Sequence, residues 1–507
     1  MTEELTGWGS QQLQLLWSRI EALLQYDPSS PLIFNSGLFL FLFVGFMGGY
    51  LLLRRTAGLR ILYVILFSIY FYYKSSGIYF LLLIFAAISD FAIAHGIART
   101  KKQSTKRWLV WLSVAINLGM LGYFKYTNFF IEIANSLFGA GFLDFKNIFL
   151  PVGISFFVFQ SMSYTIDVYR GQIKPLSNWL DYMFYLSFFP QLVAGPIVRA
   201  RDFIPQIRQP LMVSREMFGT GIGLICIGLL KKAIISDYIS LNFVDRIFDS
   251  PALYSGFECL AGIYGYALQI YCDFSGYSDM AIGIALLLGF RFPKNFDAPY
   301  KSATITEFWR RWHISLSSWL RDYLYISLGG NRKGKIRTYI NLLLTMLLGG
   351  LWHGAAVRFI LWGALHGVAL ALHKMWLAIN PWAKADGKSM SPLMRVLGVV
   401  VTFHIVCLGW LLFRAEDMQT VHLMLYQIRH NFNADIIPQV VAGYSAVFMT
   451  MAAGYVMHFI PERWDLKLSR KVADAGFWWQ VAMIVMVAWC VMQVKSSDIQ
   501  PFIYFQF

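Results

Sequence analysis

The sequence predicts an all-α, polytopic integral membrane protein, and three observations support this fold class. Of its 507 residues, 57% are hydrophobic and only 14% are charged, whereas soluble globular domains carry about a quarter charged residues. Apolar runs recur along the chain, many of them close to the roughly 20 residues that a helix needs to cross a bilayer. The net charge of +15 is typical of Lys and Arg in cytoplasmic loops, so it does not indicate a nucleic-acid partner. A soluble multidomain protein is excluded.

Taken in chain order, ten apolar segments are predicted to cross the membrane completely. They are residues 32–53, 59–73, 78–95, 108–130, 148–168, 217–235, 260–290, 394–413, 442–459 and 478–494. Two further stretches resemble partial crossings: residues 179–198, which proline and glycine interrupt, and a pair of arms at 339–348 and 359–372. Broken helices at membrane depth are tolerated only where protein buries them or a cavity lies beside them. We therefore expect about ten full spans plus re-entrant helices.

Basic residues near the ends of these spans predict the orientation of the chain. Clusters at 99–107, 199–208 and 332–337 all fall on one side if the N-terminus is outside, and the C-terminus then also lies outside. Lys231 and Lys232 are the exception, since they lie near the outer end of a span. We expect their side chains to snorkel toward the interface.

His353 lies in the segment Gly-Gly-Leu-Trp-His-Gly between the two arms. Both flanks of this hairpin are basic, so both ends are expected in the cytoplasm, with His353 and its neighbour Trp352 deep in the membrane. An ionisable residue at that depth is costly unless it faces a polar cavity or a partner. His353 is thus a candidate catalytic residue, with Trp352 in support. The alternative is a buried histidine that holds two helices together through a carbonyl.

The polar insertion at 290–339 contains a second histidine, His313. Its spacing with nearby apolar residues predicts one amphipathic helix. The apolar face is formed by Trp309, Trp312, His313, Leu316 and Leu320. The opposite face carries Arg310, Arg311 and Arg321, followed by Asp322 as a supporting residue. This helix could lie at the membrane interface, or it could form a cytoplasmic vestibule for an anionic donor, because arginine is well suited to phosphate.

A polar cluster interrupts the apolar run at 260–290. It consists of Asp273, Ser275 and Asp279, with Ser278 beside them. Buried carboxylates need partners, so they either support a site or pair with Lys or Arg of neighbouring helices. We favour the structural role. The five cysteines show no spacing typical of a metal site or a disulfide.

Four stretches together resemble the membrane-bound O-acyltransferases, in the bacterial branch that holds alginate O-acetyltransferases and teichoic acid D-alanyl transferases. The stretches are residues 190–196, 271–279, 308–323 and 351–354. The resemblance implies a helical fold around a central tunnel in the bacterial cytoplasmic membrane. It also implies that His353 is the catalytic histidine and that His313 is the second histidine of the family.

The same resemblance implies acyl transfer, most simply O-acetyl transfer, from a cytoplasmic thioester to an extracytoplasmic polysaccharide or cell-wall polymer. The donor is expected to be an acyl-coenzyme A or an acyl-phosphopantetheine carrier protein, with no bound cofactor and no metal. A base in the bilayer fits this chemistry, since desolvation favours neutral imidazole. Expected partners are membrane lipid, an acyl carrier protein, and a secreted or membrane-anchored acyltransferase or esterase-like protein that reaches the polysaccharide. The alternatives are D-alanyl transfer to teichoic acid and, in another class, a polymer or lipid transporter or a scaffold.

The chain divides into four expected regions. They are an outer amphipathic segment (1–30), N-terminal membrane helices (31–150), a catalytic core (151–414), and C-terminal helices with an aromatic tail (415–507). By pattern alone the tail, 501–507, is an anchor at the outer interface. The resemblance suggests instead that Tyr504 carries the acyl group, because the related systems include a small protein with a similar aromatic end.

Overall fold

The computed structural model describes residues 17–18, 21, 23–28, 31–380, 390–461, 464 and 470–494. Every secondary-structure element within these residues is helical, which confirms the all-α class. Most of the predicted outer segment at 1–30 and the whole aromatic tail at 501–507 lie outside the described residues. The four predicted regions therefore stay predictions.

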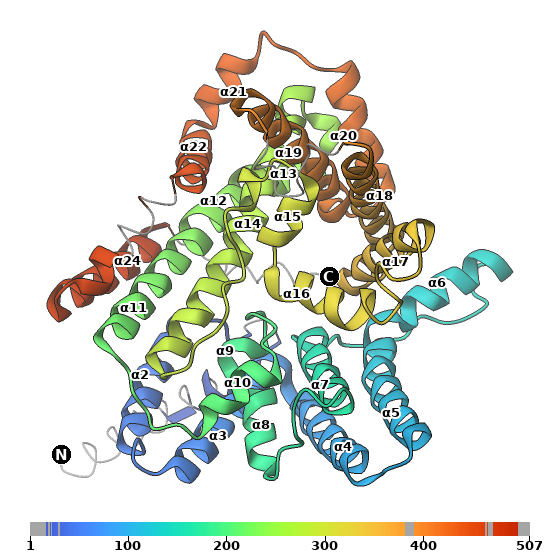
Figure 1. The fold of residues 1–507 in the computed structure, drawn as a ribbon. Coiled ribbons are helices and arrows are strands. Elements are labelled where there is room, and N and C mark those ends of the chain that lie inside the picture. Colours follow the sequence, from blue (N-terminus) through green and yellow to red (C-terminus); the bar gives the residue numbers. More distant parts are fainter. Residues whose placement is uncertain are drawn as a thin grey trace.

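The helices surround a short helix, α16, which lies near the centre of the view in Figure 1 with α7, α14, α15 and α17 around it. In chain order the α-helices are α2 (Gly37–Leu52), α3 (Ala57–Ser76), α4 (Phe80–Arg99), α5 (Gln103–Leu121), α6 (Thr127–Phe138), α7 (Ile154–Tyr169), α8 (Trp179–Ser187), α9 (Phe189–Leu192), α10 (Ala200–Ile207), α11 (Arg215–Leu229), α12 (Asp237–Ile239), α13 (Asp245–Asp249), α14 (Gly256–Leu287), α15 (Ile305–Arg311), α16 (Ile314–Trp319), α17 (Lys335–His353), α18 (Val357–Ile379), α19 (Pro392–Arg414), α20 (Met418–His430), α21 (Ile437–Gly443), α22 (Ser445–Phe459) and α24 (Phe477–Val494). Short tighter or wider helical turns connect several of them.

Within the described residues, five helical stretches are long and apolar enough to cross a membrane, or six if the bent pair α21–α22 forms one span. One of these stretches, Ala57–Arg99, has 43 residues, which is about 65 Å of helix and twice a bilayer core. It breaks at Gly77, whose φ of +58° suits a glycine turn. The multi-span class is confirmed, whereas the number of ten full spans stays a prediction.

The two arms around His353 are longer than the sequence suggested. The first arm is α17, with 19 residues, and the second is α18, with 23 residues. By length and composition α18 can cross a bilayer alone. The helix of α18 continues past the polar residues that ended the apolar run, and the re-entrant hairpin stays a prediction. The interruption at 179–198 is confirmed, since α8 and α9 are short and separate.

Helices α11 and α14 pack closely because glycines face each other. A Cβ on Gly276 would lie 2.8 Å from the carbonyl oxygen of Gly228, and a Cβ on Gly283 would lie 2.6 Å from that of Gly221. Small residues at such contacts let the helix backbones approach closely. The resulting van der Waals contact drives helix association within lipid, where the hydrophobic effect does not. Helix α14 begins with a capping box between Ser255 and its third residue, Glu258.

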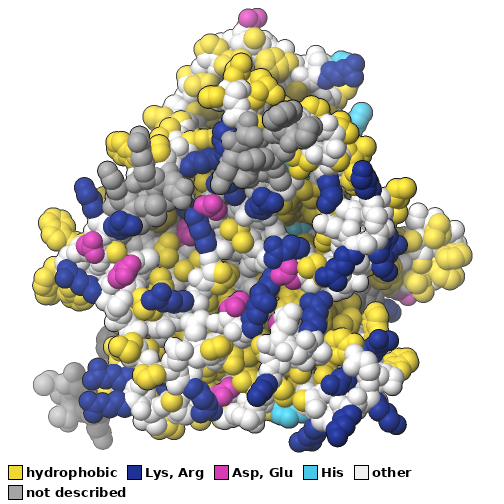
Figure 2. Space-filling model, viewed as in Figure 1, with side chains coloured by type: hydrophobic (Ala, Val, Ile, Leu, Met, Phe, Trp, Pro, Cys, Tyr) yellow, Lys and Arg dark blue, Asp and Glu magenta, His cyan; other side chains and the backbone are white. Residues whose placement is uncertain are grey.

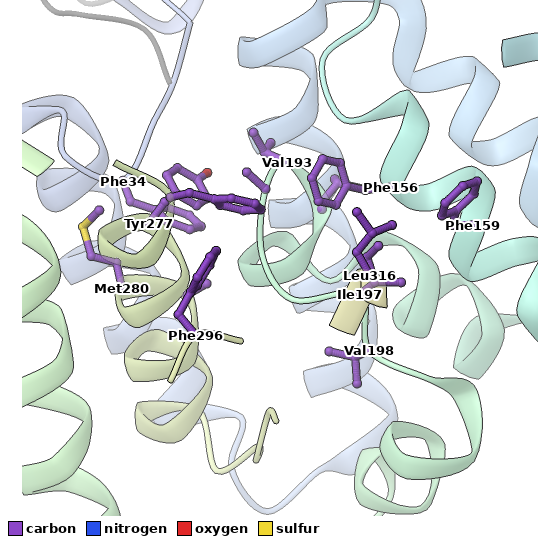
Figure 3. Packing of buried hydrophobic residues seen from close by; sticks show 14 of the residues in the cluster. Phe34, Phe156, Phe159, Val193, Ile197, Val198, Tyr277, Met280, Phe296 and Leu316 are labelled. Carbon is purple, nitrogen blue, oxygen red and sulfur yellow. The ribbon is translucent and has the colours of Figure 1, made fainter. Parts of the chain in front are cut away.

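The buried core is strongly aromatic, and Figure 3 shows two groups of its side chains. On one side Phe34 stacks on Tyr277 of α14 with ring centroids 4.6 Å apart. On the other side Phe156 and Phe159 of α7 lie near Leu316 of α16. Offset and edge contacts of this kind stabilise a core beyond simple burial. They hold α7, α14 and α16, three of the elements around the site, in one packed body.

Candidate active site

Glycines bring α17 and α18 into close contact and explain the Gly-Gly-Leu-Trp-His-Gly sequence. A Cβ on Gly350 would overlap the carbonyl oxygen of Phe359, and a Cβ on Gly363 would overlap that of Met346. At the turn, a Cβ on Gly354 would overlap the ring of Phe359. The hairpin therefore requires glycine at these points, and its tight turn holds His353 at the end of α17.

Two side chains from the turn after α5 cap the end of α17. Lys125 Nζ donates to the carbonyl oxygens of Trp352 and His353, both at 2.8 Å. The hydroxyl of Tyr126 donates to the carbonyl of Leu351 at 2.5 Å. The last carbonyls of a helix have no partner within it, and a cation there also interacts favourably with the helix dipole. These contacts fix the backbone that carries His353.

The imidazole of His353 is buried, with 4% of the residue exposed. Aromatic rings surround it: Trp352 at 4.9 Å, Trp362 at 5.0 Å and Phe413 at 5.2 Å between ring centroids. These rings come from α17, α18 and α19. A third histidine, His366 of α18, lies 4.8 Å from Trp362 and is fully buried.

The predicted amphipathic helix around His313 is not continuous, and this correction matters for the site. Helix α15 ends at Arg311, α16 begins at Ile314, and His313 between them has a left-handed backbone with φ of 42°. Such a backbone is uncommon for a residue other than glycine and is found where surrounding contacts impose it. Most of the expected apolar face is nevertheless buried. Trp312, His313, Leu316 and Leu320 are at most 6% exposed, and Trp309 is half-buried.

Asn295 imposes the break, and sequence reasoning missed it. Its Oδ1 accepts hydrogen bonds from the backbone N–H of Ser315 at 3.2 Å and from the Ser315 hydroxyl at 2.8 Å. The same oxygen lies 3.2 Å from Nδ1 of His313. Because a backbone N–H can only donate, this atom is the amide oxygen, so a neutral His313 donates from Nδ1 and keeps a lone pair on Nε2. Within the described part of the chain, that buried Nε2 has no hydrogen-bond partner.

The Asn295 network extends to two other elements. Its Nδ2 donates to the hydroxyl of Ser278 on α14 at 3.0 Å. The Ser315 hydroxyl in turn accepts from the backbone N–H of Ile197, in the interrupted stretch after α9, at 3.0 Å. A buried amide with several good partners specifies one arrangement of the backbone. Hydrogen bonds through Asn295 and Ser315 thus join two of the four motif stretches, 271–279 and 308–323, to Ile197, which directly follows a third.

The structure brings His313 and His353 to the same tryptophan. The ring of His313 lies 6.4 Å from that of Trp352, which is itself 4.9 Å from His353. His313 also meets Phe274 of α14 edge to face at 4.6 Å. The prediction that both histidines belong to one site with Trp352 is therefore consistent with the geometry.

The predicted polar cluster on α14 takes the structural role that the sequence favoured. Asp273 Oδ1 lies 2.5 Å from Lys232 Nζ, and Asp279 Oδ2 lies 2.7 Å from Lys231 Nζ. Lys232 also pairs with Asp237 at 2.8 Å. The sequence analysis expected these lysines to snorkel; instead both side chains pair with carboxylates, and that of Lys232 is 3% exposed and that of Lys231 16%. Ser275 is buried on the same helix.

The predicted donor-binding arginines do not form one surface. Arg310 is exposed at the end of α15. Arg311 pairs with Glu307 at 3.0 Å and with Asp297 at 3.4 Å. Arg321 is mostly exposed and bonds Asp322 at 2.6 Å. Glu307 and Asp297 were missed by the sequence analysis, and they explain why Arg311 faces carboxylates.

Asp322 lies in a different basic environment from the one predicted. Its carboxylate pairs with Arg199 at 2.6 Å as well as with Arg321. Although burial acts in the opposite direction, hydrogen bonds from Arg321 and Arg199 lower the pKa of Asp322. It is therefore ionised at neutral pH and belongs to a network of arginines rather than to the histidine site.

Two pockets lie at opposite ends of α7. The first, about 40 Å³, is lined by Lys125, Trp352 and residues 150–156. The second, about 380 Å³, is lined by Arg170, Gln172, Arg199, Arg201, Asp322, Tyr323, Ile326 and Ser327. Since α7 has 16 residues, its ends are about 24 Å apart. The small pocket borders Trp352 of the site, and neither pocket is lined by His353 itself.

Sequence reasoning missed Lys125 and His366 as well as Asn295. Lys125 could have been noticed as a single cation within an apolar run, which is costly without a partner. His366 lies on α18 with nothing local to mark it. Tyr504 lies outside the described residues. Among the described residues, no group of His, Cys, Asp or Glu side chains is arranged to hold a metal ion.

Comparisons of the sequence with a family model and with known proteins agree on one family. Residues 141–408 match the model of the membrane-bound O-acyltransferase family. The chain is 43% identical to a probable alginate O-acetylase AlgI of Pseudomonas aeruginosa, over 79% of this chain and 75% of the relative. It is 37% identical to a peptidoglycan O-acetyltransferase of Helicobacter pylori (77% and 78% covered) and 30% identical to a teichoic acid D-alanyltransferase of Bacillus subtilis (54% and 71%). These matches confirm the resemblance seen in the sequence. The chain belongs to the membrane-bound O-acyltransferase family and is a multi-pass membrane enzyme that transfers acyl groups to oxygen.

Proposed function

We propose that this enzyme transfers acetyl groups from a cytoplasmic thioester to an exported polysaccharide, with His353 as the general base. The observation that carries the proposal is the convergence of His353 and His313 on Trp352, between pockets at the two ends of α7. A purely structural histidine would not require a second buried histidine held in a strained backbone beside it. The similarity to O-acetylases over most of the chain favours acetyl over D-alanyl transfer, for which the similarity is lower and covers about half of the chain.

The chemistry follows from the neutral state of a buried imidazole. His353 takes the proton of the acceptor hydroxyl while the oxygen attacks the thioester carbonyl carbon. The carbon–oxygen bond forms, the carbon–sulfur bond breaks, and the proton passes to the departing thiolate. His313, with its Nδ1 held by Asn295, offers the Nε2 lone pair as a hydrogen-bond acceptor that positions the attacking group.

Access to His353 is proposed to follow a central tunnel among about ten full spans and the re-entrant hairpin. Trp352 lies between the small pocket and His353, so a change in its rotamer would connect the two. In the bacterial cytoplasmic membrane, the pocket with three arginines would face the cytoplasm, as the excess of basic residues predicts. Figure 2 shows many Lys and Arg side chains and few acidic ones on one face of the molecule. Both chain termini would then lie outside.

The acceptor side of the reaction is proposed from the relatives. An alginate-like exopolysaccharide is the first candidate, since relatives are described as alginate O-acetylases; peptidoglycan is the second. A secreted or membrane-anchored partner would take the acetyl group to the polymer. The donor would be acetyl-coenzyme A or an acetylated phosphopantetheine carrier.

The proposal is tested by replacing His353 in a strain that lacks the chromosomal copy. His353→Ala should abolish ester-linked acetate in the exported polymer while the protein remains in the membrane at the normal level. The matched control is His422→Ala, which removes an exposed histidine from α20 and should leave the ester content unchanged. Normal acetylation in the His353→Ala strain would refute the catalytic assignment and would favour a scaffold or a transporter.

Tyr504 is proposed as an acyl carrier that passes the acetyl group outward as a phenyl ester. Tyr504→Phe removes only the hydroxyl and keeps the aromatic tail, so an anchor would be unaffected. The proposal expects loss of polymer acetylation in this variant. Normal acetylation with Tyr504→Phe, together with loss on deletion of residues 502–507, would show that the tail is only an anchor.

A further inference from the structure

Asp90 lies at the middle of α4, where an ionised side chain is most costly. Helix α4 has 20 residues and is therefore about 30 Å long, so Asp90 is about 15 Å from either end and deep in the bilayer. The residue is fully buried. Asp273 and Asp279 pair with lysines, whereas the Asp90 carboxyl group contacts only neutral side chains among the described residues.

Three side chains from two neighbouring helices surround this carboxyl group, since α4, α5 and α7 lie side by side (Figure 1). Oδ1 lies 2.5 Å from the hydroxyl oxygen of Ser113 on α5. Oδ2 accepts from the side-chain amide of Asn117, also on α5, at 2.7 Å, and from the hydroxyl of Ser161 on α7. All three side chains are fully buried. The carboxyl group thus joins α4 to α5 and α7 through buried hydrogen bonds.

The number of hydroxyl hydrogens in this network indicates that Asp90 carries a proton. Ser113 Oγ lies 2.8 Å from Thr165 Oγ1 on α7, and the Thr165 hydroxyl donates to the carbonyl oxygen of Met162 at 3.0 Å. Each hydroxyl has one hydrogen. Because that of Thr165 goes to Met162, Ser113 must donate to Thr165. The contact between Ser113 and Asp90 Oδ1 then needs a hydrogen from the carboxyl group. A neutral Asp90 satisfies every contact in this series, whereas an ionised one leaves one contact without a hydrogen.

Among the described residues, the groups around Asp90 bring no charge that would offset its ionisation. The titratable side chains that face the network are Tyr182 of α8, whose hydroxyl lies 2.9 Å from that of Ser161, and Tyr164 of α7, whose ring is 4.4 Å from that of Tyr182. Tyrosine is neutral at physiological pH. A carboxylate buried without a cation is costly, and such a group takes up a proton instead. Other ionisable side chains of the surrounding helices have partners elsewhere: His95 of α4 contacts the carbonyl of Phe91, Lys74 of α3 donates to that of Leu23, Asp167 of α7 accepts from Tyr323, and Asp181 of α8 pairs with Arg208.

We propose that Asp90 is a proton-binding site, which holds one proton at neutral pH and shares it with Ser113 in a hydrogen bond. The bound proton keeps α5 packed against α4 and α7. Helix α5 leads into the turn that supplies Lys125 and Tyr126 to the end of α17, so the site supports the backbone of His353 from a distance. An aspartate of the unfolded chain is ionised above about pH 4. The folded protein therefore binds one proton more than the unfolded chain, and its stability falls as the pH rises through the neutral range.

The test is Asp90→Asn, measured through the unfolding equilibrium of the full chain in detergent micelles. Asparagine has the shape of a neutral carboxyl group, and its Nδ2 can donate to Ser113 in place of the proton. The variant should be at least as stable as the wild type at about pH 7. The ratio of its folding equilibrium constant to that of the wild type should rise about ten-fold per pH unit between about pH 5 and pH 7.

Asp279→Asn is the matched control, since it removes a carboxylate that pairs with Lys231. It should lower the folding equilibrium constant at least about ten-fold at neutral pH. A loss of that size in Asp90→Asn, or a ratio that does not change with pH, would mean that Asp90 is ionised and would overturn the inference. Stabilisation of the wild type by sodium ions at fixed pH, absent from Asp90→Asn, would show a sodium site and would also overturn it.

Infrared spectroscopy detects the proton without relying on the stability of a variant. The wild-type protein with ¹³C-labelled aspartate carboxyl groups should show the C=O stretching band of a carboxylic acid at neutral pH, and Asp90→Asn should remove that band. If the wild type lacks the band, the inference is overturned whether or not the variant folds. A band that persists in folded Asp90→Asn belongs to another aspartate and overturns it equally.

Discussion

Asn295 is predicted to be the residue that holds the second histidine in its working geometry. Asn295→Ala removes the amide but leaves the backbone, so the bond from the N–H of Ile314 to the carbonyl of Asn295, at 2.8 Å, is retained. The substitution removes the acceptor of both Ser315 donors and the partner of His313 Nδ1. All of these groups are buried.

The size of the effect follows from the groups that lose a partner. A buried donor left unsatisfied costs about 1–3 kcal/mol. Two Ser315 donors are affected, so the lost stability is roughly 2–6 kcal/mol. The left-handed backbone of His313 carries strain of the order of 1–3 kcal/mol. In the variant, the Asn295 amide is no longer present to hold the backbone in this strained conformation. Relaxation of that backbone would move the imidazole away from Trp352, so activity should fall by more than the loss of folded protein explains.

The assay combines thermal unfolding of the purified protein with the rate of thiol release from acetyl-4′-phosphopantetheine. Ser278→Ala is the matched control: it removes only the bond to Asn295 Nδ2 and should cost about 1 kcal/mol, with normal turnover. Wild-type stability and turnover in Asn295→Ala would contradict the role of the amide. An equal loss of turnover in Ser278→Ala would show that the network as a whole, rather than the bond to His313, is what matters.

Three further predictions concern the supports of the site. In the thermal unfolding assay, Gly350→Ala places a methyl group against the carbonyl of Phe359 and should lower the stability by about 1–3 kcal/mol. The control is Gly45→Ala on α2, where no atom lies within 4 Å of the added methyl group; it should be neutral or slightly stabilising. Lys232→Met removes the cation that pairs with the buried carboxylate of Asp273 and the half-buried one of Asp237, and it should destabilise the protein by about 3–5 kcal/mol. A smaller loss than in the Gly350→Ala protein would contradict the role of this ion pair. Lys125→Met removes two hydrogen bonds to the end of α17 and should lower kcat with little change in KM. Lys125→Arg keeps a cation at this position and should retain part of kcat. An effect on KM alone would refute the positioning role of Lys125.

Much of the fold could be predicted because membrane helices follow simple composition rules. The apolar runs at 59–73 and 394–413 correspond to α3 and α19, and the proline and glycine interruption at 179–198 corresponds to the break after α8. The second arm of the hairpin was predicted too short, since hydropathy alone ended it at residue 372 whereas the hydrogen-bonded helix continues to Ile379. Hydropathy marks only the apolar part of a helix, so it underestimates the length of a helix that extends into polar surroundings.

The site was predicted in part. The motif around His353 could be recognised, but the break at His313 could not, since periodicity through Trp309 and Leu320 fits a continuous helix. The break depends on Asn295, which lies 18 residues earlier in the chain, and such long-range hydrogen bonds leave no local pattern. The same is true of Arg170 and Arg199, whose pocket forms only when α7 and α10 meet the turn after α16. In each case the arrangement depends on contacts between residues far apart in the sequence, which local sequence patterns do not reveal.

The central claim is that His353 performs the proton transfer of the acyl-transfer step. Its most direct test is the single-turnover rate of thiol release from acetyl-4′-phosphopantetheine, with an oligosaccharide acceptor, by proteoliposomes containing wild-type or His353→Ala enzyme at saturating donor. The account predicts an unchanged dissociation constant for the donor and a rate at least about 100-fold lower in the variant. A rate within a few-fold of the wild type, with the donor bound equally well, would contradict it.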